Sequence, residues 1–234
     1  MCENGVAWRV AVWVCVLAWL GGPSLASAQQ VEKVERPDLK IGDTWTYERF
    51  DAFKGTRESF NRSRVAKLDG DSVEMEITDA ESGKVLGKDI YTRELRLSLR
   101  ELGSVRVSNE PAYPYLSFPL EIGKRWSQKV TQTRAGMSQP IEIDLEGKVV
   151  GWEDVSVKAG SFKAIKVEVS GYFHVTTRMG ERLNVSVSDH VWYVPEVRRS
   201  VKHAIREEGV GGPPALRGVR RNEVIELREY QLVQ

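Results

Sequence analysis

Apolar and polar residues alternate with a period of two along most of this chain. The pattern is clearest at residues 73–77, 141–145, 165–169 and 183–187. Successive side chains of an extended strand point to opposite faces, so each segment can bury one face and leave the other in water. Antiparallel sheets with one solvated face give this alternation, whereas fully buried parallel strands give continuous apolar runs. The pattern therefore predicts an all-β fold of antiparallel strands.

Short clusters of turn-forming residues separate these segments, and each cluster contains a glycine. They lie at residues 68–71, 81–84, 159–160 and 179–181. Glycine adopts the positive φ angles that tight hairpin turns require. Residues 90–102 also fit a helix, but the spacing of their leucines favours a strand. The stretch 207–214, rich in glycine and proline, is expected to form a long mobile loop before a closing strand at 224–233.

An internal repeat is the most informative feature of the sequence. The pattern L-x-I-G-x-x-W occurs at residues 39–45 and again at 120–126. A weaker similarity joins residues 91–96 to 193–198. Within the first pattern, the leucine and isoleucine are expected to point to one face, the glycine to allow a turn and the tryptophan to begin the next strand. We interpret these matches as an internal duplication.

The half-repeats would span roughly residues 37–110 and 118–234, with the junction at the proline-containing segment 109–115. Two such units give either an antiparallel two-sheet sandwich or one strongly curved half-barrel sheet. Both architectures share one core, so we expect residues 29–234 to form a single β-rich domain.

The amino terminus has the features of a secretory signal peptide. Arg9 precedes an apolar run over residues 10–20, and small residues end at Ala28. Cleavage there would leave a mature chain that begins at Gln29. The run is shorter than the roughly 20 residues of a membrane-spanning helix, and no later stretch is longer or more apolar. We therefore predict a signal peptide at residues 1–28 and a periplasmic or secreted bacterial protein with no transmembrane segment after cleavage; an uncleaved amino-terminal anchor is the alternative.

Charge and cysteine content exclude several classes of protein. The chain has 34 Lys and Arg against 33 Asp and Glu, a formal net charge of +1 and 41% hydrophobic residues. The ordinary apolar content excludes a disordered chain, and the balanced charge together with export argues against nucleic acid as a partner. Both cysteines, Cys2 and Cys15, lie in the signal segment. The mature protein is therefore expected to have no disulfide, zinc–thiolate site or cysteine nucleophile.

Catalytic clusters are not evident in the sequence. The three histidines lack the short spacing of metal ligands and lie on different predicted strands: His174, His190 and His203. We therefore predict no metal and no cofactor. Glu142, Asp144 and Glu146 share one strand face and are candidates for the paired acids of a sugar-cleaving groove. A solvated outer face explains the same spacing.

Aromatic and basic residues supply the best candidate for a binding surface. Trp192 and Tyr193 are expected to point to opposite faces of one strand, so that one ring lies away from the core. After Pro195, three basic residues share one predicted strand face and form a stripe that an anionic lipid headgroup or envelope polymer could contact. An ordinary solvated face that blocks edge pairing is the other interpretation. The predicted binding residues are Trp152, Trp192, Tyr193, Arg198, Lys202 and Arg206.

Four stretches of the sequence resemble a group of uncharacterised secreted bacterial proteins built on a β-rich domain of unknown function. They include the patterns G-x-x-W-x-Y and W-Y-x-P-E-V-x-R-x-V-K and lie at residues 42–47, 119–126, 151–164 and 191–202. The resemblance implies an envelope location and an all-β domain akin to the curved sheets of lipoprotein carriers. It implies no catalytic residues, and the Gly/Pro loop at 209–214 departs from it.

The sequence therefore leads to two functional hypotheses. The first is a non-enzymatic envelope protein that binds an apolar or amphipathic ligand or docks a partner protein. Its expected partners are a lipid, an envelope polymer or an envelope protein. The alternative is a carboxylate-dependent hydrolase that acts on envelope polysaccharide.

Overall fold

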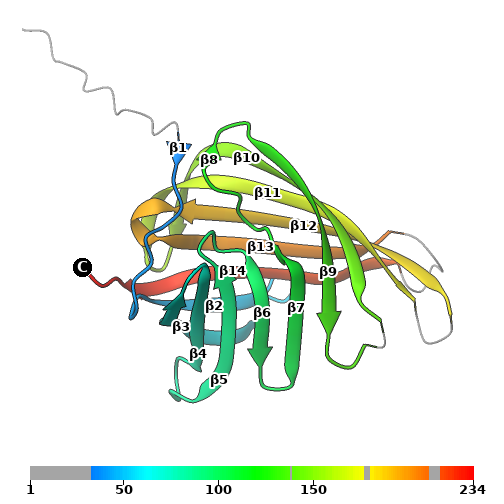
Figure 1. Cartoon of the computed structure of the whole chain (residues 1–234), viewed down its shortest axis with the longest axis horizontal. Helices are drawn as coiled ribbons and strands as arrows, with labels where there is room; N and C mark the ends of the chain where they lie inside the picture. The colour runs from blue at the N-terminus through cyan, green and yellow to red at the C-terminus, as the bar shows by residue number, and fades with distance from the viewer. Residues whose placement is uncertain (1–32, 138, 177–179, 211–216) are drawn as a thin grey trace, which may run out of the picture. The chain divides into compact units, whose positions relative to one another are not determined.

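Twelve antiparallel strands form a closed barrel in the part of the chain that the structure describes (Figure 1). The structure is a computed structural model that describes residues 33–137, 139–176, 180–210 and 217–234. The predicted signal peptide and most of the predicted Gly/Pro loop lie outside these residues.

The barrel strands follow one another in two runs of six. The first run is β2 (Thr44–Asp51), β3 (Arg57–Asp69), β4 (Ser72–Asp79), β5 (Val85–Thr92), β6 (Leu97–Leu102) and β7 (Val105–Tyr113). The second run is β9 (Arg125–Arg134), β10 (Ile141–Val157), β11 (Gly160–Thr176), β12 (Arg182–Val194), β13 (Arg199–Gly209) and β14 (Gly218–Gln231). Two short strands, β1 (Lys33–Val34) and β8 (Leu120–Glu121), pair separately, and one 3-10 turn, η1 (Pro195–Val197), joins β12 to β13.

The predicted all-β antiparallel class is confirmed, whereas the two-sheet sandwich is wrong. The sheet does curve strongly, as expected for a half-barrel, but it continues until it closes. Strand β7 pairs with β9, and β14 pairs with β2. Closure pairs every barrel strand on both sides and so leaves no exposed sheet edge. Period-two alternation is the same in a sandwich and a barrel, so the sequence pattern could not separate them.

The two copies of the L-x-I-G-x-x-W pattern form the same turn. Gly42 and Gly123 have φ angles of 97° and 86°. Each glycine N–H donates to a valine carbonyl, that of Val65 or Val149, at 2.9 Å. In both copies the residue after the glycine donates to the carbonyl three positions earlier and accepts from the N–H of the same valine. Six barrel strands follow the first turn before the second one, and six follow the second; the duplication itself stays a prediction.

The leucine and isoleucine of the pattern do not share a face, contrary to the prediction. Leu39 and Leu120 are buried, whereas Ile41 and Ile122 are 57% and 47% exposed. The turn begins at the isoleucine, so the period of two no longer applies between the two side chains.

Residues 90–102 form two strands and not one. A turn separates β5 from β6, and within it Leu95 has a φ of 60° and is buried. The Leu95 N–H donates to the carbonyl of Thr92 at 2.9 Å, which reverses the chain. The leucine spacing therefore predicted the strand type correctly but missed the turn.

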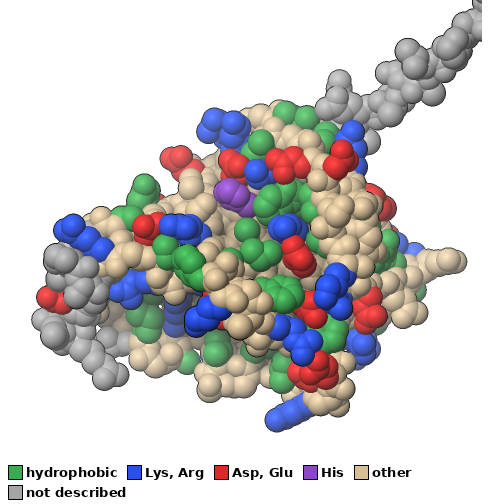
Figure 2. All heavy atoms as spheres, turned by 180° about the vertical axis from the view of Figure 1, so that it is seen from behind, with side chains coloured by type: hydrophobic (Ala, Val, Ile, Leu, Met, Phe, Trp, Pro, Cys, Tyr) green, Lys and Arg blue, Asp and Glu red, His purple; other side chains and the backbone are tan. Residues whose placement is uncertain are grey.

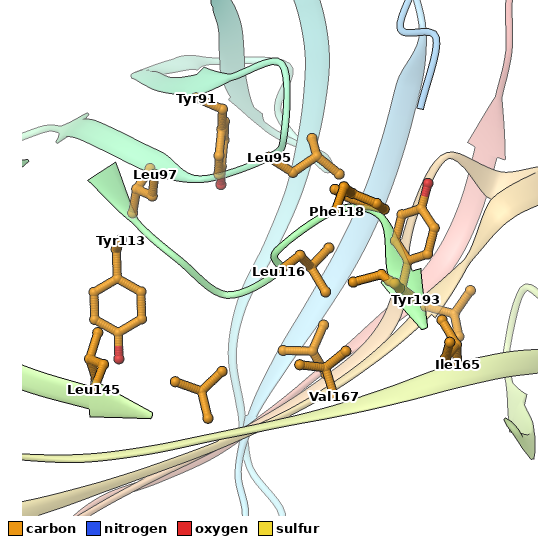
Figure 3. Close-up of a cluster of buried hydrophobic side chains, with 14 of the residues drawn as sticks. Tyr91, Leu95, Leu97, Tyr113, Leu116, Phe118, Leu145, Ile165, Val167 and Tyr193 are labelled. Carbon is orange, nitrogen blue, oxygen red and sulfur yellow. The ribbon is translucent and has the colours of Figure 1, made fainter. Parts of the chain in front are cut away.

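The connection from β7 to β9 passes through the barrel interior (Figure 3). Its residues Leu116 and Phe118 are buried, and the Phe118 ring lies 5.2 Å from the ring of Tyr193 on β12. Lys124 Nζ donates to the carbonyls of Ser117 and Pro119 at 2.7 and 2.8 Å, so the buried backbone keeps hydrogen-bond partners. We call residues 113–119 the internal segment. The junction predicted at 109–115 is thus partly strand, because β7 extends to Tyr113.

Candidate functional site

A cavity of about 180 Å³ lies inside the barrel, next to the internal segment. Strands β2 to β6, β13 and β14 supply most of its wall, and Tyr115 and Leu116 of the internal segment supply another part. Part of the wall is apolar: Ile77, Leu95, Leu102, Leu116, Val191, Ile205 and Ile225. The rest is polar and carries the ionisable groups Arg49, Asp89, Arg100, Arg199, His203 and Arg221.

Strand alternation explains why charged side chains reach the interior. On β2, Trp45, Tyr47 and Arg49 lie at i, i+2 and i+4 and therefore share a face. Trp45 is fully buried, and its indole N–H donates to the Val197 carbonyl at 2.8 Å. The same face thus places Tyr47 and then Arg49 along the cavity wall.

Arg100 and Asp89 form a complete ion pair in the wall. The Arg100 Nε and Nη2 atoms donate to the two Asp89 oxygens at 2.9 and 2.7 Å, and Tyr91 Oη donates to the same carboxylate at 3.1 Å. Burial acts to lower the pKa of Arg100, but the hydrogen bonds and charge of Asp89 raise it above its usual value. This bidentate geometry satisfies both groups.

Arg221 and Arg49 share the carboxylate of Glu223. Arg221 donates to both Glu223 oxygens at 2.8 Å and contacts Glu207 at 3.3 Å. Arg49 Nη1 lies 3.2 Å from Glu223, but its buried Nε has no hydrogen-bond partner among the described residues. Burial is the largest influence on the pKa of Arg49 and lowers it. Arg49 is therefore only partly paired.

Arg199 has no carboxylate within 4 Å among the described residues. Its guanidinium carbon lies 5.2 Å from the ring centre of Trp45 and 5.1 Å from that of Tyr91, and Nη1 contacts Met75 Sδ at 2.6 Å. Burial raises the pKa of the Tyr47 hydroxyl, and the Arg199 charge acts in the opposite direction. Burial acts to lower the pKa of Arg199, but its interactions with Tyr47, Tyr91 and the charge of Asp89 raise it above its usual value. The cation is thus held by ring faces, a thioether and these polar groups, with no carboxylate in direct contact.

A second polar group links the internal segment to the barrel. Asp189 is buried, accepts a hydrogen bond from Tyr113 Oη at 3.0 Å and lies 3.3 Å from His203 Nε2. The His203 ring meets the Tyr115 ring edge-on at 5.1 Å. Burial raises the pKa of both tyrosines, so each remains a neutral hydrogen-bonding group.

The predicted aromatic residues occupy different places. Tyr193 is buried in the core, whereas Trp192, its neighbour on the alternating strand, is only partly buried and packs against core residues. The Trp192 indole N–H donates to Glu153 at 2.7 Å, and Lys166 and Lys202 lie 5.4 and 5.9 Å from its ring. Trp152 packs against the core, and its buried indole nitrogen has no partner in the described part of the chain.

The predicted basic stripe is wrong as a continuous strand face. Arg198 precedes β13, has a φ of 60°, and its guanidinium is paired with the fully buried Asp43 at 2.8 Å. Lys202 pairs with Glu226 and Arg206 with Glu208, both at 2.9 Å. Figure 2 shows acidic and basic side chains interspersed over one face of the surface. A binding role for these residues stays a prediction, and none of them lines the cavity.

The candidate acids lie on the outer wall of the barrel. Glu142 and Asp144 have side chains that are 69% exposed, and Lys129 bridges them at 3.4 and 3.6 Å. Asp144 and Glu146 border an open surface pocket together with Tyr172, which is 60% exposed. The acids therefore have the open surroundings of the solvated-face interpretation.

The histidines do not converge. His174 contacts Asn184 on the outer face, His190 lies against Trp192, and His203 faces the interior. Within the described ranges, no group of three His, Cys, Asp or Glu side chains is arranged to hold a metal ion. The same residues include no helix with the length and apolar character needed to cross a membrane.

Comparison with known proteins gives a match in fold but not in sequence. The sequence matches no protein-family model and no curated protein. The barrel is similar to a YmcC-like fold. A Bacteroides fragilis protein of that fold, described as exported, has a TM-score of 0.52 and 16% identity, over 85% of this chain and 99% of its own. This likeness supports the resemblance to exported β-rich proteins at the level of fold.

Two proteins described as lipoproteins give weaker matches. One from Parabacteroides distasonis has a TM-score of 0.49 and 14% identity, over 85% of this chain and 99% of its own. Lipoprotein YmcC of Escherichia coli has a TM-score of 0.40 and 12% identity, over 83% and 87%.

The cavity residues were missed by the sequence analysis. A signal was present: Arg49 lies on the same alternating face as Trp45 and Tyr47, and Asp89 on that of Tyr91. A charge on an otherwise apolar strand face predicts either a buried ion pair or a polar interior site. The convergence of several strands on one cavity depends on ring closure and was not visible in the sequence.

Proposed function

We propose that this protein is a non-enzymatic protein of the bacterial envelope that binds an amphipathic ligand inside its barrel. The single observation behind the proposal is the internal cavity, which has both an apolar wall and a cationic wall. Ligand sites are typically concave, largely apolar and equipped with a few convergent polar groups. The predicted signal peptide and the likeness to an exported protein support the location.

The size of the cavity limits what it holds. A volume of about 180 Å³ corresponds to roughly six water molecules at ~30 Å³ each, below the ~300–1,000 Å³ typical of sites for drug-sized ligands. It accommodates a headgroup and the first carbons of a chain. A longer chain requires the internal segment or neighbouring side chains to move.

The hydrolase alternative has less support. Its candidate acids are exposed on the outer wall, and Lys129 lies between two of them. Paired acids of glycoside hydrolases flank a bound sugar, which an open wall does not position. We therefore favour binding over hydrolysis.

The proposal can be tested with protein purified from the envelope of its host. Native mass spectrometry shows whether a small molecule is bound, and lipid extraction releases it. We expect a bound small molecule that organic solvent releases. Ile225→Trp, which places an indole in the cavity wall, should abolish saturable amphiphile binding. Val85→Trp is the matched control, because Val85 is 57% exposed. A ligand-free mass together with no saturable binding would remove the proposal.

A further inference from the structure

Two guanidinium groups in the cavity wall are not fully paired with acids. Arg199 has no carboxylate partner among the described residues, and the buried Nε of Arg49 makes no hydrogen bond to them. A guanidinium carries five N–H donors and stays charged inside proteins. Buried charges are normally paired, because an unpaired one loses its hydration without replacement. Both residues line the cavity, so its wall carries cationic groups that its acids do not fully pair.

Both arginines line the same cavity, and Tyr47 lies close to each of them. Tyr47 and Arg49 are successive inward residues of β2, so their Cα atoms lie roughly 7 Å apart. The Tyr47 hydroxyl interacts with Arg199 and donates to the adjacent Ser200 carbonyl at 2.8 Å. Tyr47 therefore connects the two guanidinium positions.

The acids near the cavity are already paired with other groups. Asp89 accepts two hydrogen bonds from Arg100, and Glu223 accepts two hydrogen bonds from Arg221. Asp189 lies with His203 and Tyr113, at the internal segment. These contacts leave Arg199 without a carboxylate in direct contact, and Arg49 with one oxygen of Glu223 that it shares with Arg221.

We propose that an acidic headgroup, a carboxylate or a phosphate monoester, binds between Arg199 and Arg49. The inference rests on the proposed function, since it names the class of ligand that enters the cavity. Guanidinium groups bind both kinds of anion through paired N–H donors. The apolar wall at Ile77, Ile205 and Ile225 then contacts the first carbons of the alkyl chain.

Isothermal titration of the delipidated full-length mature protein tests the inference with four probes: decanoate, decyl phosphate, decanol and inorganic phosphate. We expect decanoate and decyl phosphate to bind at least tenfold more tightly than decanol. Arg49→Gln and Arg199→Gln should each remove that preference without weakening decanol binding. Arg64→Gln is the matched control, because Arg64 is an exposed residue of β3 that pairs with Glu76 at 2.9 Å.

The outcomes separate the inference from the proposed function. Equal binding of decanol and decanoate would overturn the headgroup site and leave the amphiphile-binding function intact. Failure of all four probes to bind would overturn both. Inorganic phosphate that binds as tightly as decyl phosphate would show a site for a free anion and overturn the chain contact. Arg199 packs on Trp45, so its variant is first checked for folding by tryptophan fluorescence; if it does not fold, Arg49→Gln decides the outcome.

Discussion

Replacement of Asp43 with asparagine tests the contact that ties three distant parts of the chain together. The Asp43 carboxylate is fully buried and accepts hydrogen bonds from the Lys40 N–H at 2.9 Å and the Val233 N–H at 2.8 Å. It also accepts from Arg198 Nη1 at 3.0 and 2.8 Å. The contact joins the first repeated turn, the β12–β13 connection and the carboxyl terminus. Asparagine keeps the shape but removes the charge and turns one acceptor into a donor.

Asp43→Asn is expected to lower the free energy of unfolding by much more than an ordinary surface substitution does. Removal of one partner from a buried ion pair costs about 3–5 kcal/mol. The Arg198 side chain is 22% exposed, so water partly solvates its charge when the carboxylate is removed. We therefore expect a loss at the lower end of this range, about 3 kcal/mol. Domains have total stabilities of about 5–15 kcal/mol. With a urea m-value of about 3 kcal/mol/M, the unfolding midpoint should fall by about 1 M.

Equilibrium urea unfolding followed by tryptophan fluorescence measures this change. Asp69→Asn is the matched control, because Asp69 is exposed and pairs with exposed Lys67 at 2.9 Å. We expect no measurable change of its midpoint. The double variant with Arg198→Gln should be less destabilised than the sum of the single variants, since both changes remove the same ion pair.

Two results would refute the reasoning about Asp43. One is a midpoint shift of Asp43→Asn no larger than that of Asp69→Asn. The other is strict additivity with Arg198→Gln, which would show that the pair does not contribute as a unit.

Three further predictions concern separate parts of the chain. In Gly147→Ala, the new Cβ would lie 2.1 Å from the Trp126 ring, so the ring must move. We expect the free energy of unfolding to fall by about 1–3 kcal/mol and the tryptophan fluorescence to change. A variant with the stability and the fluorescence of the wild type would contradict this packing. Burial acts to raise the pKa of Glu223, but hydrogen bonding and charge from Arg221 lower it below its usual value. The stabilisation from ionised Glu223 should therefore be complete above the pKa of the unfolded state and disappear as the pH falls through the pKa of the folded state. The unfolding free energy of Glu223→Gln should then fall less in acid than that of the wild type. If urea unfolding at several pH values gives the same pH dependence for both proteins, this prediction is wrong. Intact-mass measurement of the exported protein should give Gln29 as its first residue, and a retained signal segment would contradict cleavage.

Local features of the fold were readable because they depend on neighbours in sequence. The repeated pattern accounts for the positive φ of Gly42 and Gly123. It also accounts for the strands that start beside Trp45 and Trp126, each of which is the second residue of its strand. The turn at Leu95 was missed, because a leucine with a positive φ carries no turn signal of its own. Its conformation is held by burial in the core.

The candidate site was predicted less well than the fold. The opposite orientations of Trp192 and Tyr193 followed from strand alternation. Arg198 looked like a surface cation, but the structure pairs it with Asp43, which lies 155 positions earlier in the chain. A partner at that distance is fixed by the packing of the repeated turn against the β12–β13 connection.

The sequence by itself determined the class of element, the direction of most side chains along each strand and the two equivalent turns, because these depend on pleat geometry and on glycine. Tertiary structure decided that the sheet closes, that the internal segment fills part of its centre, and that Arg49 and Arg199 face one cavity. Closure is a property of the whole ring: each strand must find its second neighbour, and the pairing of β14 with β2 joins residues far apart in the chain.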